Sequence, residues 1–282
     1  MLRPDPDVVP AAPRSRTGTG YARATRPIAA HAISTPADGL VAGEVTIPSG
    51  DLTMPAYRAC PEEAGPFPVV IVVSEIFGVH EYVADVARRL ARLGYLAIAP
   101  EMFVRQGDAK APVDVPTLVA SVVSKVPDAQ AMADLDACVA WAGENGGDTG
   151  RLGVTGFCWG GRMTWLFSAH QAAVRAGVAW YGRLAGPATP LQPRHPVDIT
   201  GELRAPVLGL YGDADAGIPL ATVEQMKAAL AQGSAAAKAS EFVVYPKAQH
   251  AFHADYRPAY DEAAAKDGWQ RCIAWLRANG VA

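Results

Sequence analysis

The residues best suited to chemistry lie in the segment 156–161, with the sequence Gly-Phe-Cys-Trp-Gly-Gly. The apolar run 151–155 precedes it, and a helix-like segment, 162–167, follows it. A strand, a Gly-x-nucleophile-x-Gly turn and a helix hold a nucleophile in a tight turn above a sheet. Glycines are needed there because a Cβ would collide with the neighbouring strand or helix. The pattern predicts that Cys158 is a nucleophile. The alternative is a buried cysteine in a glycine-rich strand-to-helix turn.

A cysteine nucleophile needs a general base, and the base needs an acid that orients it. His250 follows one strand-like run near the end of the chain, and Asp213 and Asp215 follow the run before it. The order nucleophile, acid, histidine is that of the α/β-hydrolases, in which each member lies on a loop after a late strand. Asp213 adjoins its strand and suits a turn. We therefore predict the triad Cys158, His250 and Asp215, with His253 as a less suitable base.

Two backbone N–H groups are candidates for an oxyanion hole. The N–H of Trp159 follows the nucleophile at a helix N-terminus, where a developing negative charge is stabilised. The loop after the first buried strand, 74–78 (Ser-Glu-Ile-Phe-Gly), supplies the second donor in this fold, so Ile76 is predicted to provide it. Glu75 adds a carboxylate at the same edge of the sheet. Its alternative role is to interact with the dipole of the next helix.

Strand-like and helix-like segments alternate and would position these residues. Segments 43–48 and 52–57 flank a Ser-Gly-Asp turn, which predicts an antiparallel hairpin. The β-branched run 67–73 is typical of a strand buried on both faces. The remainder predicts strands at 95–100, 151–155, 176–181, 206–211 and 241–245, and helices at 82–93, 128–144, 219–232 and 258–278. The fold class is α/β: an α/β-hydrolase fold with a mostly parallel central sheet and helices on both faces. Ligands bind such sheets at the carboxyl ends of the strands.

Composition narrows the possible classes. The chain has 282 residues, of which half are hydrophobic and 19% charged, so it can form one large domain. A net charge of −3 gives no reason to expect nucleic acid or a membrane surface as partner, and no apolar run is long enough to span a bilayer. The four cysteines are widely spaced, which fits neither a zinc site nor a disulfide framework and predicts a reducing, cytoplasmic location. We expect Cys138 and Cys272 to lie in helix cores.

The first part of the chain differs from the rest. Residues 1–42 are rich in Pro, Arg, Ala and Thr, without sustained periodicity, and we expect a loosely ordered arm. The early arginines are not followed by a continuous apolar stretch, and no twin-arginine pair occurs, so an export signal is not predicted. The hydrolase domain is predicted at 43–282.

From about residue 43 onward the chain resembles the dienelactone hydrolase (carboxymethylenebutenolidase) family. The resemblance depends on a cysteine elbow together with a glutamate–isoleucine–phenylalanine–glycine loop. The matching residues are 74–78, 156–161, Asp215 with Ile218 and Pro219, His250 with Phe252, and the C-terminal run 260–271.

The resemblance implies hydrolysis of an ester or lactone by the triad, through a thiol-ester acyl-enzyme. It also implies that Glu75 holds the resting thiol and accepts its proton. Arg105 aligns with the family arginine that binds the substrate carboxylate, a pairing that is bidentate and orienting. Tyr181, which ends the strand-like run 176–181, is a further candidate for substrate binding. The family's second arginine, four residues after the histidine, is replaced by Ala254, which makes dienelactone doubtful as the native substrate.

Two other functions are compatible with the same residues. One is a broad α/β-hydrolase that acts on xenobiotic esters or thioesters, and the other is a non-catalytic, ligand-sensing domain. A complete triad with Glu75 argues against the second. The sequence has no phosphate loop, metal-ligand cluster or nicotinamide fingerprint, so we expect neither cofactor nor metal. The expected partner is a small ester or lactone, with or without a carboxylate, and the expected state is a monomer or small homo-oligomer.

Overall fold

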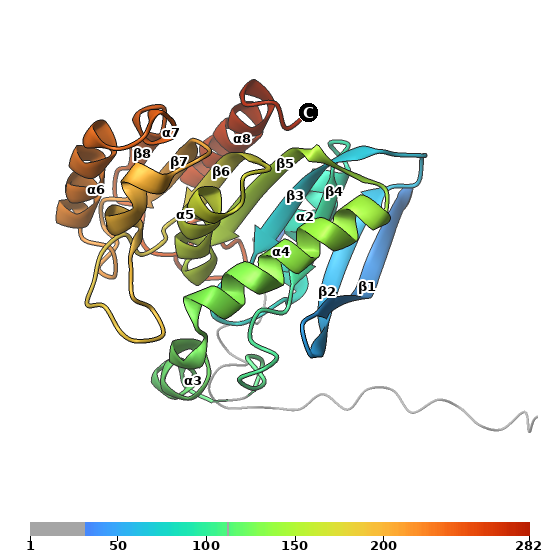
Figure 1. Ribbon diagram of the computed structural model, residues 1–282, viewed down its shortest axis with the longest axis horizontal. Coiled ribbons are helices and arrows are strands. Elements are labelled where there is room, and N and C mark those ends of the chain that lie inside the picture. The colour runs from blue at the N-terminus through green and yellow to red at the C-terminus, as the bar shows by residue number, and fades with distance from the viewer. Residues whose placement is uncertain (1–31, 112) are drawn as a thin grey trace, which may run out of the picture.

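The computed structural model describes residues 32–111 and 113–282, so residues 1–31 of the expected arm lie outside the described part. Figure 1 shows one central sheet between two layers of helices. Its eight strands lie in the order β1-β2-β4-β3-β5-β6-β7-β8. They are β1 (Leu40–Ser49), β2 (Leu52–Pro61), β3 (Phe67–Val73), β4 (Leu96–Pro100), β5 (Gly147–Phe157), β6 (Val174–Trp180), β7 (Val207–Gly212) and β8 (Glu241–Tyr245).

The sheet is parallel except at one edge. β1 pairs with β2, and β2 pairs with β4, in antiparallel register. The other neighbouring strands, in the order β4-β3-β5-β6-β7-β8, pair in parallel register. The carboxyl ends of β3 to β8 therefore meet at the same edge of the sheet. This arrangement confirms the predicted mostly parallel sheet of an α/β-hydrolase fold.

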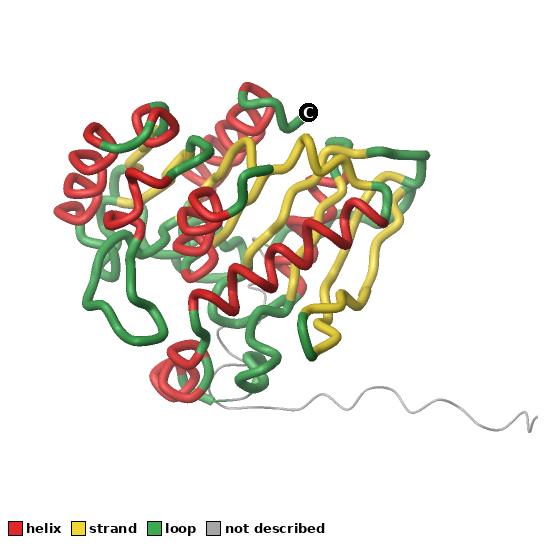
Figure 2. Tube along the Cα trace, in the orientation of Figure 1, coloured by secondary structure: helices red, strands yellow, loops and turns green. Residues whose placement is uncertain are grey.

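Helices cover both faces of the sheet. α4 (Asp128–Glu144), α5 (Trp159–His170) and α6 (Leu220–Gln232) lie in front of it in Figures 1 and 2, and α2 (Glu81–Ala91) and α8 (Glu262–Ala278) lie behind it. Each layer encloses its own hydrophobic core. β3 serves both, because Ile71 packs in one core and its neighbours Val70 and Val72 pack in the other.

The predicted elements agree with the structure in kind and differ at their ends. α4 has the predicted bounds, whereas β1 begins at Leu40, within the predicted arm, and α8 begins at Glu262, four residues later than expected. The helices α3 (Val115–Ser121) and α7 (Ala235–Lys238) and the 3₁₀ turns Val123–Lys125 and Pro196–Glu202 were not predicted. Cys138 in α4 and Cys272 in α8 are buried, as expected.

The described end of the predicted arm is attached to α2. The backbone N–H of Thr35 donates to the Asp85 carboxylate at 2.5 Å, and Nε of Arg88 donates to the carbonyl of Thr35 at 2.8 Å. Asp85 is fully buried, so this largely exposed segment is fixed to the domain by a buried carboxylate. Within the described chain, no helix is long and apolar enough to cross a membrane.

Candidate active site

The turn between β5 and α5 holds Cys158 in a conformation that non-glycine residues seldom adopt, with φ 55° and ψ −111°. The backbone around it is tightly packed. A Cβ on Gly156 would lie 2.2 Å from the carbonyl oxygen of Gly160, and one on Gly160 would lie 2.1 Å from the carbonyl oxygen of Val73. Side chains cannot occupy those positions, so the two glycines permit the strained turn that lifts the half-buried Cys158 to the sheet edge.

His250 and Asp215 meet beside that turn. Nδ1 of His250 lies 2.7 Å from Oδ2 of Asp215, whose other oxygen accepts the backbone N–H groups of Gly217 and Ile218 at 2.8 and 3.1 Å. The buried carboxylate is thereby fixed against the imidazole. Asp213 is exposed and accepts the backbone N–H of Lys247 at 2.5 Å, which is the turn role expected for it.

The neighbours of His250 favour its protonated form. Burial opposes a positive charge on the ring, but the Cys158 thiolate and hydrogen bonds to Asp215 and Cys158 outweigh it and raise the pKa of His250 to about 10. The protonated imidazole is therefore the favoured form of His250 near neutral pH. In this form the ring can donate a proton to a leaving group.

A cavity of about 330 Å³ opens at this edge of the sheet. Its wall brings together five of the residues predicted from the sequence: Ile76, Cys158, Trp159, Tyr181 and His250. The ring of Tyr181 is fully buried and meets His250 edge to face, with centroids 5.1 Å apart. His253 does not line this cavity. It is buried against aromatic rings with Nδ1 at 2.6 Å from the Tyr82 hydroxyl, and burial lowers its pKa.

Glu75 lies at the same edge but is held by different partners. Its carboxylate is buried, with Oε2 accepting the Tyr256 hydroxyl at 2.7 Å and Oε1 lying 3.7 Å from Nη1 of Arg257. Oε1 has no hydrogen-bond partner among the described residues. The Glu75 carboxylate therefore does not make, in this conformation, the thiol contact that the resemblance implies. Cys158 instead shares its cavity wall with His250.

Comparisons with known proteins agree with this geometry. The profile of the Dienelactone hydrolase family matches residues 54–280. A Methylorubrum extorquens protein with the provisional name carboxymethylenebutenolidase is 59% identical over 266 residues, which cover 94% of this chain and 90% of that protein. An Escherichia coli K12 protein with the same provisional name is 53% identical over 263 residues, or 93% of this chain and 96% of that protein. The chain belongs to the dienelactone hydrolase family.

A solved structure supports the same assignment. The crystal structure of a provisionally named dienelactone hydrolase from Klebsiella pneumoniae is 58% identical and superposes with a TM-score of 0.82. The match covers 84% of this chain and 98% of that chain. The protein is thus a hydrolase of the α/β-hydrolase fold. Among the residues that the structure describes, no cluster of three or more His, Cys, Asp or Glu side chains could hold a metal ion.

Arg105, which was also predicted as a site residue, does not belong to the described wall of the Cys158 cavity. Its Nη1 donates to buried Asp134 of α4 at 2.9 Å, and its Nη2 donates to the carbonyl of Ser49 at 2.5 Å. Nε lies 3.6 Å from the carboxylate of Asp51. The guanidinium therefore joins the β1–β2 hairpin to α4 in this conformation.

Two other arginines, neither of them predicted from the sequence, line the cavity of this hydrolase. Both guanidinium Nη atoms of Arg162 bond to Asp128, at 2.6 and 2.7 Å, so its charge is matched. Arg183 is exposed and has no acidic partner among the described residues. No Asp or Glu side chain belongs to the described wall of the cavity. Arg183 follows the end of β6 by three residues, so the strand-end rule that selected the triad would also have selected it.

Proposed function

We propose that this protein hydrolyses carboxylic esters or lactones through a thioester formed on Cys158. One observation carries the proposal: a strained cysteine, an imidazole with a raised pKa and a buried, hydrogen-bonded aspartate meet at one cavity. Three loops that follow three different strands supply them. A structural role for Cys158 alone would require neither the positive φ nor the partners.

The reaction follows from these positions. The thiolate of Cys158 attacks the substrate carbonyl carbon, and the oxyanion that forms is stabilised by the N–H groups of Ile76 and Trp159. As the carbon–oxygen bond breaks, the His250 imidazolium donates its proton to the departing alkoxide. The product is an alcohol and a thioester on Cys158. Asp215 keeps the imidazole in one orientation throughout.

Water completes the cycle. Neutral His250 accepts a proton from a water molecule, and the resulting hydroxide attacks the thioester carbonyl. The carbon–sulfur bond breaks, which releases the carboxylic acid and restores the thiolate beside a protonated His250. We assign Glu75 as an alternative acceptor for the thiol proton. Its Oε1 is buried and not hydrogen-bonded, whereas its Oε2 is held by Tyr256.

The charges around the cavity favour a substrate with an anionic group. The described wall carries Arg162 and Arg183 but no carboxylate, and only Arg183 is without an acidic partner. A carboxylate on the substrate would meet a free guanidinium there. Arg257 lies 3.7 Å from the Glu75 carboxylate and forms an ion pair with it. We therefore propose Arg183 rather than Arg105 as the residue that binds the substrate carboxylate, with Tyr181 forming the adjacent wall.

The test is a pre-steady-state measurement with p-nitrophenyl acetate. We expect a burst of p-nitrophenol equal to the concentration of active sites, and an acetyl group on Cys158 in the intact-mass spectrum of the quenched enzyme. Prior treatment with iodoacetamide should abolish both. A burst that persists in the alkylated protein would remove Cys158 from the mechanism, and the absence of any turnover would favour the ligand-sensing alternative.

A further inference from the structure

The loop between β3 and α2 carries two of the groups on which the proposed function depends, Glu75 and Ile76. Neither a strand nor a helix fixes this loop, since β3 ends at Val73 and α2 begins at Glu81. Its side toward the elbow is held by close backbone packing: a Cβ on Gly160 would lie 2.1 Å from the carbonyl oxygen of Val73 and 2.7 Å from that of Ser74. The outer part of the loop needs a second support.

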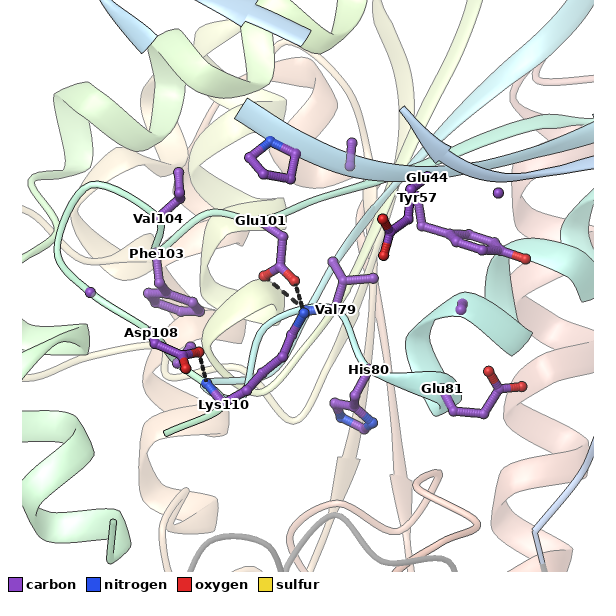
Figure 3. Close-up of a pocket in the computed structure, with 16 residues that line it drawn as sticks. Glu44, Tyr57, Val79, His80, Glu81, Glu101, Phe103, Val104, Asp108 and Lys110 are labelled. Atoms are coloured by element: carbon purple, nitrogen blue, oxygen red, sulfur yellow. Dashed lines mark hydrogen bonds and ion pairs between the residues drawn. The ribbon is translucent and has the colours of Figure 1, made fainter. Parts of the chain in front are cut away.

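Glu101 supplies that support from the loop after β4. Its Oε2 accepts the backbone N–H of Val79 at 3.1 Å, and its Oε1 forms an ion pair with Nζ of Lys110. Figure 3 shows the Glu101 carboxylate beside Val79 and the end of the Lys110 side chain, on the wall of a second cavity of about 810 Å³. The backbone of Glu101 is fixed as well, because its N–H donates to the carbonyl of Pro55 in β2 at 2.9 Å.

The backbone of Gly78 packs closely against the Glu101 carboxylate. Its φ is +68°, and a Cβ at that position would lie 2.5 Å from Oε2 of Glu101. The side chain of Glu101 is only 17% exposed, so it has little room to move aside. The loop conformation and the position of Glu101 therefore depend on each other. Neither residue touches the Cys158 cavity.

We propose that Glu101 is a positioning residue, which fixes the loop 74–79 so that the N–H of Ile76 faces the oxyanion formed at Cys158. This role for Glu101 rests on the proposed function, in which the N–H of Ile76 stabilises the oxyanion. Oxyanion stabilisation acts in the transition state, so its loss lowers kcat and leaves KM nearly unchanged. A displaced donor also spares steps in which no oxyanion forms, such as alkylation of the thiol by iodoacetamide.

The experiment compares three variants in hydrolysis of p-nitrophenyl acetate. Glu101→Ala should lower kcat about ten- to a hundredfold, the effect of a donor displaced by about 1 Å. Glu101→Gln keeps an oxygen that accepts the Val79 N–H and should recover most of the rate. Lys110→Met, the matched control, removes the partly exposed ion pair but keeps the acceptor, and should stay within about fivefold of wild type.

Alkylation of Cys158 by iodoacetamide should proceed at the wild-type rate in all three variants. The proposal is overturned by a wild-type kcat in Glu101→Ala, by equal losses in the Ala and Gln variants, or by alkylation that falls together with kcat. Should Glu101→Ala fail to fold, Gly78→Ala tests the same contact and should show the same separation of kcat from alkylation. Cys158→Ala is assayed in parallel, and hydrolysis that survives in that variant would refute the proposed function itself, whatever the Glu101 variants show.

Discussion

Two cavities adjoin the loop 74–80, and the histidine in the wall of each has a shifted pKa of opposite sign. His250, beside Cys158, has its pKa raised to about 10. His80, in the wall of the larger cavity, has its pKa lowered to about 3 by burial together with the charges of Lys110 and Arg257. Burial favours the neutral form of both rings, so burial alone cannot explain the difference.

The groups next to each histidine explain why the two pKa values shift in opposite directions. Nδ1 of His250 faces a buried carboxylate 2.7 Å away, and Cys158 beside the ring also favours its protonated form. His80 packs against the rings of Tyr82 and Tyr256, and its Nε2 has no hydrogen-bond partner among the described residues. Perturbed pKa values gather at functional sites, and a carboxylate beside a buried histidine is one way to raise its pKa. The contrast supports the proposal that the reactive site is the smaller cavity, although the other has more than twice its volume.

The largest expected effect is that of Cys158→Ala. The substitution removes both the proposed nucleophile and a group that raises the pKa of His250. We expect kcat/KM for p-nitrophenyl acetate to fall about 10⁴- to 10⁶-fold. The pKa of His250, followed by NMR of its ring protons, should fall below 10. Cys60→Ala, at a buried cysteine outside the cavity, serves as the control. Cys158→Ser should fold but turn over much more slowly, because a hydroxyl does not give up its proton as a thiol does.

The second prediction separates the two aspartates that follow β7. Asp215→Asn keeps the size of the side chain but replaces the carboxylate that orients His250, so kcat should fall about 10³- to 10⁴-fold. Asp213→Asn alters only a turn contact to Lys247 and should stay within about threefold of wild type. Steady-state kinetics of both variants, with circular dichroism as a check of folding, test this order. A reversed order would mean that the wrong aspartate is assigned to the triad.

Backbone constraints explain which features the sequence could predict. The turn around Cys158 needs glycine wherever a Cβ would collide with the backbone. Gly156 and Gly160 therefore form a pattern from which the turn can be predicted. Parallel strands place their following loops at one edge, which brings His250 and Asp215 to Cys158. Glu101 and Arg183 also follow strands, so the same rule could have found them, although it says nothing about their side-chain partners.

Partners joined across the chain could not be predicted in this way. Tyr256 bonds to Glu75 across 181 residues, and Arg105 bonds to Asp134 in a different layer of the fold. The alignment of Arg105 with a family arginine indicates its position on the backbone but not which carboxylate its guanidinium meets. The position of a residue in the sequence thus predicts the loop in which it lies. Its role also depends on the side chains that contact it, and these are known only once the chain is folded. The oligomeric state and the compartment stay predictions.

The third prediction tests the neutral histidine of the larger cavity. The unfolded chain binds a proton at His80 near pH 6.5, whereas the folded chain does so only near pH 3. Between these values the unfolded state holds more protons, so the free energy of unfolding falls as the pH falls, by up to about 1.4 kcal/mol per pH unit from this group. His80→Gln should flatten the slope by that amount in urea titrations between pH 6.5 and 4.5. Val79→Ala, which removes packing but no titratable group, should lower stability and keep the slope. An unchanged slope in His80→Gln would mean that His80 is not held neutral.

The smallest expected effect is on the preference for a negatively charged substrate. It is tested by comparing substitutions of Arg183 and Arg105. Arg183 is exposed and without an acidic partner among the described residues, so its contact with a substrate carboxylate is screened by solvent and worth about 1 kcal/mol, or about fivefold in kcat/KM. We expect Arg183→Gln to reduce by that factor the preference for a carboxylated lactone over its methyl ester, with hydrolysis of the neutral ester unchanged. Arg105→Gln should keep the preference and instead lower the melting temperature, because buried Asp134 loses a charged partner. A preference that survives in Arg183→Gln and disappears in Arg105→Gln would reverse the assignment. It would mean that the hairpin arginine reaches the substrate in a conformation other than the one described.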